Sequence, residues 1–90
     1  MALGAKHILV ETLDEVEILR EQIVNGSMSF ETAAGLKSLC PSKQNGGDLG
    51  LFQPGQMVKP FEDAVVNAAV GAVTHPVQTQ FGYHLIMRTA

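Results

Sequence analysis

Two histidines stand in short apolar stretches at opposite ends of the chain, His7 in "AKHILVE" and His84 in "FGYHLIMR". An imidazole in such a place can bind a metal, transfer a proton or hold a hydrogen-bond network. In an extended chain, residues two apart share a face, so His7 shares its face with Leu9 and His84 with Ile86. Either each histidine is a satisfied residue of the core, or the two meet in space and act together.

A metal site and a thiol nucleophile are the first alternatives to consider. Zinc needs three or four ligands at short spacings, and the sequence has one cysteine and no CxxC or HxxxH pattern. Cys40 lies in "SLCPS", near the expected end of a helix, where the helix dipole disfavours a thiolate. A covalent role for Cys40 is therefore disfavoured, while a small buried residue and a non-covalent role in the site stay open. One cysteine also excludes an internal disulfide and favours a reducing, cytoplasmic location.

The stretch "GGDLGLFQPGQMVKPFEDA", residues 46–64, places glycines beside large apolar side chains. It matches neither the phosphate-binding loop of nucleotide hydrolases nor the dinucleotide fingerprint, and Asp48 would repel a phosphate. Two interpretations remain. The glycines either form a structural turn that needs positive φ, or a flexible rim beside an apolar binding floor that includes Met57 and Phe61.

Length, composition and charge predict the domain organisation and argue against further classes of protein. Ninety residues predict a single domain spanning residues 1–90, and 46% hydrophobic residues predict that it folds. The net charge of −3 and six scattered basic residues argue against nucleic acid as the partner. Apolar runs end well short of the ~20 residues that a membrane-spanning helix needs. The first four residues show no secretory signal.

The first half of the chain predicts one strand and two helices. The strand covers residues 5–11. The first helix begins at residues 12–14, with Asp14 and Glu17 at capping-box spacing, and ends at Asn25. Ser29 caps the second helix, which Pro41 ends. The apolar side of this second helix is expected to carry Phe30, Ala33, Ala34, Leu36, Leu39 and Cys40.

The second half predicts a loop over residues 42–55 with a short strand near 49–52, then a helix from Pro60 to about Asn67. Two strands joined by a tight turn near Phe81 and Gly82 end the chain. This order of elements indicates an α+β domain with a small, mostly antiparallel sheet.

Three separated motifs, "KHILV", "GGDLGLFQPGQMVKPFEDA" and "VQTQFGYHLIMR", resemble the parvulin family of peptidyl-prolyl cis–trans isomerases. They occur in the right order and span nearly the whole chain, which is most similar to the minimal single-domain members. The resemblance implies an α+β, parvulin/FKBP-like fold of four mostly antiparallel strands wrapped by about four helices. It also implies a monomer that acts on proline-containing peptides and folding proteins without a metal or cofactor.

Carried over residue by residue, the resemblance implies two groups of site residues. The histidine pair His7 and His84, oriented by the hydroxyl of Thr79, forms the centre, and Cys40 lies beside the substrate amide. The pocket that receives the proline ring is expected to comprise Leu49, Met57, Phe61 and Phe81.

The chain departs from the phosphate-directed members at several positions. Their basic cluster after the first strand has no counterpart, because this chain has the acidic stretch "ETLDEVE" there. Phe81 replaces a serine, and Val58 replaces a glutamine found in some relatives. We therefore expect phosphorylation-independent isomerisation with a preference for apolar residues before proline. The alternatives are a non-catalytic peptide-binding chaperone module of the same fold and a thiol-dependent hydrolase.

Overall fold

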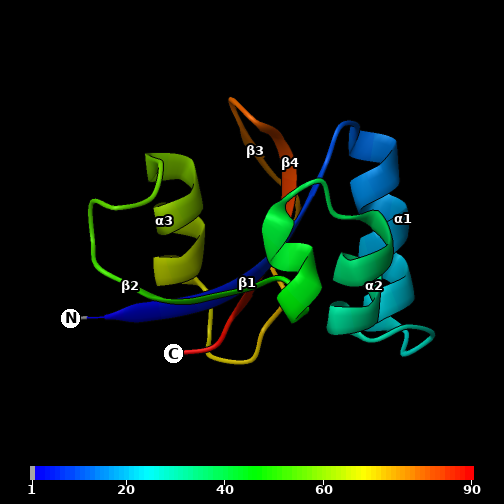
Figure 1. Cartoon of the computed structure of the whole chain (residues 1–90), viewed down its shortest axis with the longest axis horizontal. Helices are drawn as coiled ribbons and strands as arrows, with labels where there is room; N and C mark the ends of the chain where they lie inside the picture. Colours follow the sequence, from blue (N-terminus) through cyan, green and yellow to red (C-terminus); the bar gives the residue numbers. More distant parts are fainter. Residues whose placement is uncertain (1) are drawn as a thin grey trace.

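A computed structural model describes residues 2–90, which form a four-stranded antiparallel sheet with helices on both faces (Figure 1). The strand order is β2-β1-β4-β3, with bounds β1 Leu3–Val10, β2 Asp48–Phe52, β3 Val77–Thr79 and β4 Gly82–Arg88. The helices are α1 Leu13–Val24, α2 Phe30–Lys37, the 3-10 helix η1 Pro41–Asn45 and α3 Lys59–Asn67. The expected α+β class is confirmed, with three α-helices and one 3-10 helix in the described chain rather than about four helices.

The two central strands bury apolar residues on both faces, because each face is covered by helices. Ile8 and Leu85 belong to a buried cluster with residues of α1 and α2. Leu3, Ala5 and Ile86 belong to a second cluster, with residues of β2 and α3. Figure 1 shows α3 on one side of the sheet and α1 with α2 on the other. The sheet therefore separates two layers of core.

The start of α1 differs from the expected capping pair. Thr12 has an extended backbone, and its Oγ1 accepts the Glu15 N–H at 3.2 Å. The same hydroxyl donates to Glu15 Oε1 at 3.1 Å. The N-cap is therefore Thr12, and the residue bonded to it is Glu15, so the pair is not the expected Asp14 and Glu17. The helix ends at Val24 with Asn25 as its C-cap, as expected.

The second helix is capped by Ser29 as expected, but it ends at Lys37. Ser38 leaves the helix in an extended conformation, and the Leu39 N–H then donates to Leu9 O at 2.8 Å. The prediction that the helix runs to Cys40 and buries Leu36 and Leu39 is wrong. Leu36, which is still within α2, is 65% exposed, and Leu39, where the chain has left the helix to pair with the end of β1, is 57% exposed.

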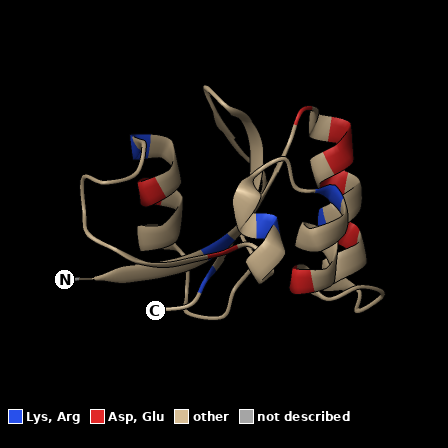
Figure 2. Cartoon of the chain, viewed as in Figure 1, with Lys and Arg blue, Asp and Glu red and all other residues tan. Residues whose placement is uncertain are grey.

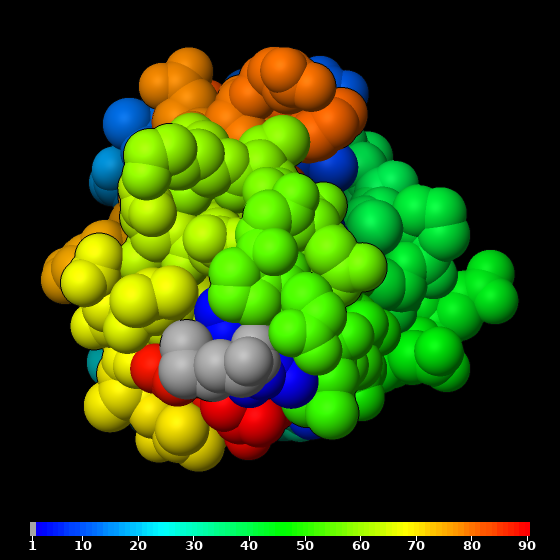
Figure 3. Space-filling model, turned by 90° about the vertical axis from the view of Figure 1, so that its left-hand side faces the viewer, coloured from blue at the N-terminus to red at the C-terminus, as the bar shows by residue number. Residues whose placement is uncertain are grey.

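The C-terminal half follows the expected order. Pro60 lies in the first turn of α3, and β3 and β4 are joined by the two-residue turn 80–81, one residue earlier than expected. The start of β1 lies beside the end of the chain, where the Gly4 N–H donates to Ala90 O at 3.1 Å. Figure 3 shows these blue and red segments together at the edge of the molecule. Within residues 2–90, no helix is long and apolar enough to cross a membrane.

Candidate active site

The pairing of β1 with β4 brings the two histidines together. His7 is opposite Ile86 and Leu9 is opposite His84, so the two imidazoles are diagonal neighbours on the α3 face of the sheet. Their Nδ1 atoms lie 3.0 Å apart and their rings are inclined by only 20°. Both side chains are buried. The histidines therefore do meet in space, and one donates its Nδ1–H to the other.

Thr79 extends this network from the neighbouring strand β3. Its Oγ1 lies 2.7 Å from His84 Nε2 and also accepts the Phe81 N–H at 3.2 Å. His84 thus has a hydrogen-bonding partner at each ring nitrogen, which fixes the orientation of the ring. The opposite end of the network is His7 Nε2, a buried atom without a hydrogen-bond partner in the described part of the chain. The network therefore runs from the β3–β4 turn through both rings.

Burial keeps both imidazoles neutral. Desolvation, reinforced by the neighbouring His84 ring, lowers the pKa of His7 from 6.5 to about 4. Desolvation also lowers the pKa of His84. Near pH 7 the pair is therefore an uncharged hydrogen-bonding unit, without an imidazolium to donate protons.

We expect the free energy of unfolding to decrease as the pH falls from about 6.5 to about 4. The unfolded chain protonates its histidines at their ordinary pKa near 6.5, whereas folded His7 resists protonation until about pH 4. The stabilisation present above pH 6.5 is therefore lost across that window, by up to about 3 kcal/mol for His7. Urea unfolding at a series of pH values measures the loss. An imidazolium ¹⁵N pattern for His7 at pH 6 in the folded protein would contradict this expectation.

Phe61 packs against the histidine pair from α3. Its ring is edge-on to His7 at a centroid distance of 5.5 Å and to His84 at 5.4 Å. Phe52 of β2 supports the ring from a further side at 6.3 Å. Helix α3 fixes this position, because the extended residue Val58 starts the helix and places Phe61 in its first turn. The three aromatic rings of Phe61, His7 and His84 thus form a rigid, uncharged floor.

A pocket of about 460 Å³ opens above this floor. Leu49, Met57, Phe61 and Phe81, the four residues expected to hold a proline ring, all line it, as does Cys40. Thr79 is not a lining residue and contributes through His84. Further lining residues, which no motif in the sequence indicates, are Leu9, Leu39, Pro41 and Gln56.

Cys40 reaches the pocket from a position other than the expected one. It has an extended backbone before the 3-10 helix η1, three residues beyond the end of α2. Cys40 therefore does not lie in the last turn of a helix, where a helix dipole was expected to act on its thiol. The nearby hydroxyl of Ser38 accepts the Cys40 N–H at 3.3 Å and the Leu9 N–H at 3.1 Å. This buried serine, which the sequence analysis missed, fixes the wall of the pocket to β1.

The glycines of the 46–64 stretch do not line the pocket, although other residues of the stretch do. Gly46, Gly47 and Gly50 are absent from its lining residues, and Gly47 is buried. Gly47 has φ +84°, and its O accepts the His7 N–H at 2.9 Å. A Cβ at this position would lie 2.4 Å from His7 O. The structural interpretation therefore holds for Gly47: a glycine is needed because the backbone approaches β1 closely.

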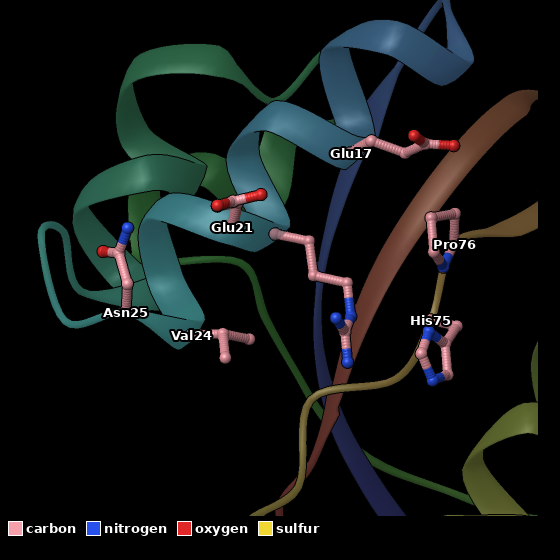
Figure 4. Close-up of a pocket in the computed structure, with 7 residues that line it drawn as sticks. Glu17, Glu21, Val24, Asn25, His75 and Pro76 are labelled. Atoms are coloured by element: carbon pink, nitrogen blue, oxygen red, sulfur yellow. The ribbon is translucent and has the colours of Figure 1, made fainter.

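A second hollow, of about 420 Å³, lies between α1 and the segment before β3 (Figure 4). Glu17, Glu21 and Val24 project from the helix, while His75 and Pro76 face them. Arg20 also lines the hollow, and its Nε donates to Thr74 O at 3.0 Å. The residues that line this hollow are mostly exposed, and the hollow lacks the buried imidazoles and the aromatic floor of the first pocket. Across residues 2–90, no group of three or more His, Cys, Asp or Glu side chains is placed to hold a metal ion.

Comparison with known sequences bears directly on this site. Residues 6–90 match the family described as "Rotamase: PPIC-type PPIASE domain". The chain is 45% identical over 78 residues to the peptidyl-prolyl cis-trans isomerase Pin1 of Arabidopsis thaliana, covering 87% of this chain and 66% of that protein. It is 42% identical over 85 residues to the foldase protein PrsA of Geobacillus sp. (strain WCH70), covering 94% of this chain and 31% of that protein. The chain thus spans two thirds or less of these relatives.

Solved structures agree with this assignment. The crystal structure of the peptidylprolyl isomerase PrsA from Bacillus anthracis superposes with a TM-score of 0.96 at 38% identity, over 99% of this chain and 41% of that one. The solution structure of NmPin, the parvulin of Nitrosopumilus maritimus, superposes with a TM-score of 0.86 at 38% identity, over 99% and 96% of the two chains. The resemblance carried by the three sequence motifs is confirmed, and the chain belongs to the PPIC-type family of peptidyl-prolyl cis–trans isomerases, the parvulins.

Proposed function

We propose that this chain isomerises Xaa-Pro peptide bonds without a requirement for phosphorylation, and prefers apolar residues before the proline. The observation that carries the proposal is the apolar pocket over Phe61 and the histidine pair, with no Lys or Arg among its lining residues. An uncharged pocket of this kind suits a proline ring with an apolar neighbour.

The geometry fits the physical demands of the reaction. Rotation about an Xaa-Pro bond meets a barrier of roughly 20 kcal/mol, because the amide loses resonance as it twists. No covalent bond breaks, so a catalyst needs only to hold the ring and bind the twisted amide better than either planar form. The buried ring of Phe61 offers a surface for the proline, and a dry pocket disfavours the more dipolar planar amide.

The site residues take distinct roles in this proposal. His7, Thr79 and His84 hold the hydrogen-bond network that shapes the floor, without transferring a proton. Cys40 sets the local polarity beside the substrate carbonyl. The proline ring rests on the apolar lining, formed by Leu49, Met57, Phe61 and Phe81.

The charge around the pocket supports independence from phosphate. Figure 2 shows acidic residues in the turn after β1 and along α1, although α1 itself covers the face of the sheet opposite α3. Glu11, which is exposed, directly follows β1, whose Leu9 lines the pocket. A phosphate dianion before the proline needs Arg or Lys as partners, and none lines the pocket, while the charged residue directly after β1 is the acidic Glu11.

A peptide series that differs only in the residue before proline tests the proposal. We expect kcat/KM to be highest for Leu-Pro and Phe-Pro, lower for Ala-Pro, and at least about tenfold lower for Glu-Pro and phosphoserine-Pro, a difference of about 1.4 kcal/mol in the barrier. Raising the salt concentration should narrow the gap for the charged peptides. Faster turnover of phosphoserine-Pro than of Leu-Pro would refute the specificity. Binding without exchange of the Xaa-Pro bond would instead favour the non-catalytic chaperone module.

A further inference from the structure

Three apolar side chains line the pocket around the end of β1, beyond the Phe61 floor. Leu9 is on the same face of β1 as His7, two residues further along. Leu39 flanks it because its N–H donates to Leu9 O at 2.8 Å. Phe81 belongs to the β3–β4 turn, where a Cβ on Gly82 would lie 3.3 Å from Leu9 Cδ1. Leu9, Leu39 and Phe81 all line the pocket, and together they form what we term the leucine lip.

The leucine lip lies within reach of a neighbour of a proline held on the floor. Leu9, Leu39 and Phe81 line the same pocket as Phe61, and that pocket measures about 460 Å³. A peptide with its proline ring on Phe61 therefore brings a neighbouring side chain to the leucine lip.

The lip is apolar, exposed and held in place before any peptide binds. Leu39 is 57% exposed and Phe81 60% exposed, so a bound apolar side chain would cover large apolar surfaces on both. The hydroxyl of Ser38 ties the Leu39 segment to β1. The Phe81 N–H donates to Thr79 Oγ1 at 3.2 Å. Little ordering is therefore required on binding, which favours selectivity.

We propose that Leu39 is a specificity-determining residue, and that the leucine lip is the subsite for the side chain immediately before proline. The inference rests on the proposed isomerase function. It names the residues that would contact the side chain before proline and so cause the preference for apolar residues there. The apolar preference for the residue before proline was expected from Phe81 alone, and the inference adds Leu9 and Leu39 to it.

Leu39→Lys tests the inference against a matched control, Leu36→Lys. Leu36 has the same side chain and is 65% exposed, but it is on α2 and does not line the pocket. For Leu39→Lys we expect the ratio of kcat/KM for Leu-Pro to that for Glu-Pro to fall at least about tenfold. For Leu36→Lys the ratio should stay within about twofold of the unmodified protein, which excludes a general effect of net charge. When the peptides differ instead in the residue after proline, Leu39→Lys should leave the ratio of their kcat/KM values unchanged.

The possible results distinguish a failure of the subsite inference from a failure of the proposed isomerase function. If Leu39→Lys behaves like Leu36→Lys, or if the shift follows the residue after proline, the inference is overturned while the isomerase function stands. If the unmodified protein does not isomerise any peptide of the series, the proposed function itself fails. Should Leu39→Lys not give a folded NMR spectrum, Leu39→Ala replaces it. That variant should lower kcat/KM for Leu-Pro at least threefold more than for Ala-Pro, and equal losses would overturn the inference.

Discussion

Replacing Phe61 with alanine is expected to lower kcat/KM for Leu-Pro peptides by at least about a hundredfold, corresponding to roughly 3 kcal/mol of lost transition-state binding. The side chain is 3% exposed and packs edge-on against both histidines, so its removal opens the floor on which the proline ring would rest. The same change should destabilise the fold by about 3–5 kcal/mol, because it leaves a cavity in the α3 layer of the core. Protease-coupled or NMR exchange assays give the rate, and urea unfolding gives the stability.

Val65→Ala is the control for the Phe61 experiment. Val65 is fully buried in the same cluster, one turn further along α3, but it does not line the pocket. Val65→Ala should lower the free energy of unfolding by less than Phe61→Ala does, and it should leave kcat/KM nearly unchanged. A folded Phe61→Ala protein with the turnover of Val65→Ala would remove Phe61 from the proposed proline site.

Gly47→Ala should be the most destabilising of the glycine substitutions in the 46–55 stretch, at more than about 3 kcal/mol. About 1–2 kcal/mol comes from the positive φ of +84°, which a side chain disfavours. The remainder comes from a Cβ placed 2.4 Å from His7 O, a contact that backbone atoms must move to relieve. That movement also weakens the 2.9 Å bond between the His7 N–H and Gly47 O.

Gly50→Ala isolates the conformational part of that cost. Gly50 has a similar φ of +71°, but a Cβ there would meet nothing within 4 Å. It should lose only about 1–2 kcal/mol. Urea unfolding of both variants measures the difference, and equal losses would show that the approach to β1 does not constrain residue 47.

The central part of the site was predictable because it depends on regular structure. Alternation along two strands puts His7 and His84 on inner faces whatever the details of the loops. Once those strands pair in the observed register, the histidines become diagonal neighbours. The α+β class followed from the order of elements for the same reason.

The errors arose where a contact distant in sequence determines the local structure. The second helix stops at Lys37 because Ser38 and Leu39 bond to Leu9, about thirty residues earlier, and no local pattern shows this. Leu39 therefore appeared to be a core residue of a helix instead of a wall of the pocket. For Gly47 the sequence left open a structural turn or a flexible rim, because the close approach to β1 that decides between them exists only in the folded chain.

The pairing of β1 with β4 also determines when the protein can assemble during synthesis. These strands occupy the middle of the sheet, yet 76 residues separate His7 from His84 along the chain. Closing so long a loop precedes any gain from the contacts, and a nascent chain cannot close it until β4 has left the ribosome. The centre of the sheet and the histidine pair therefore form in one late step. A partly synthesised chain lacks the aromatic floor, so the proposed activity would appear only once β4 has paired with β1.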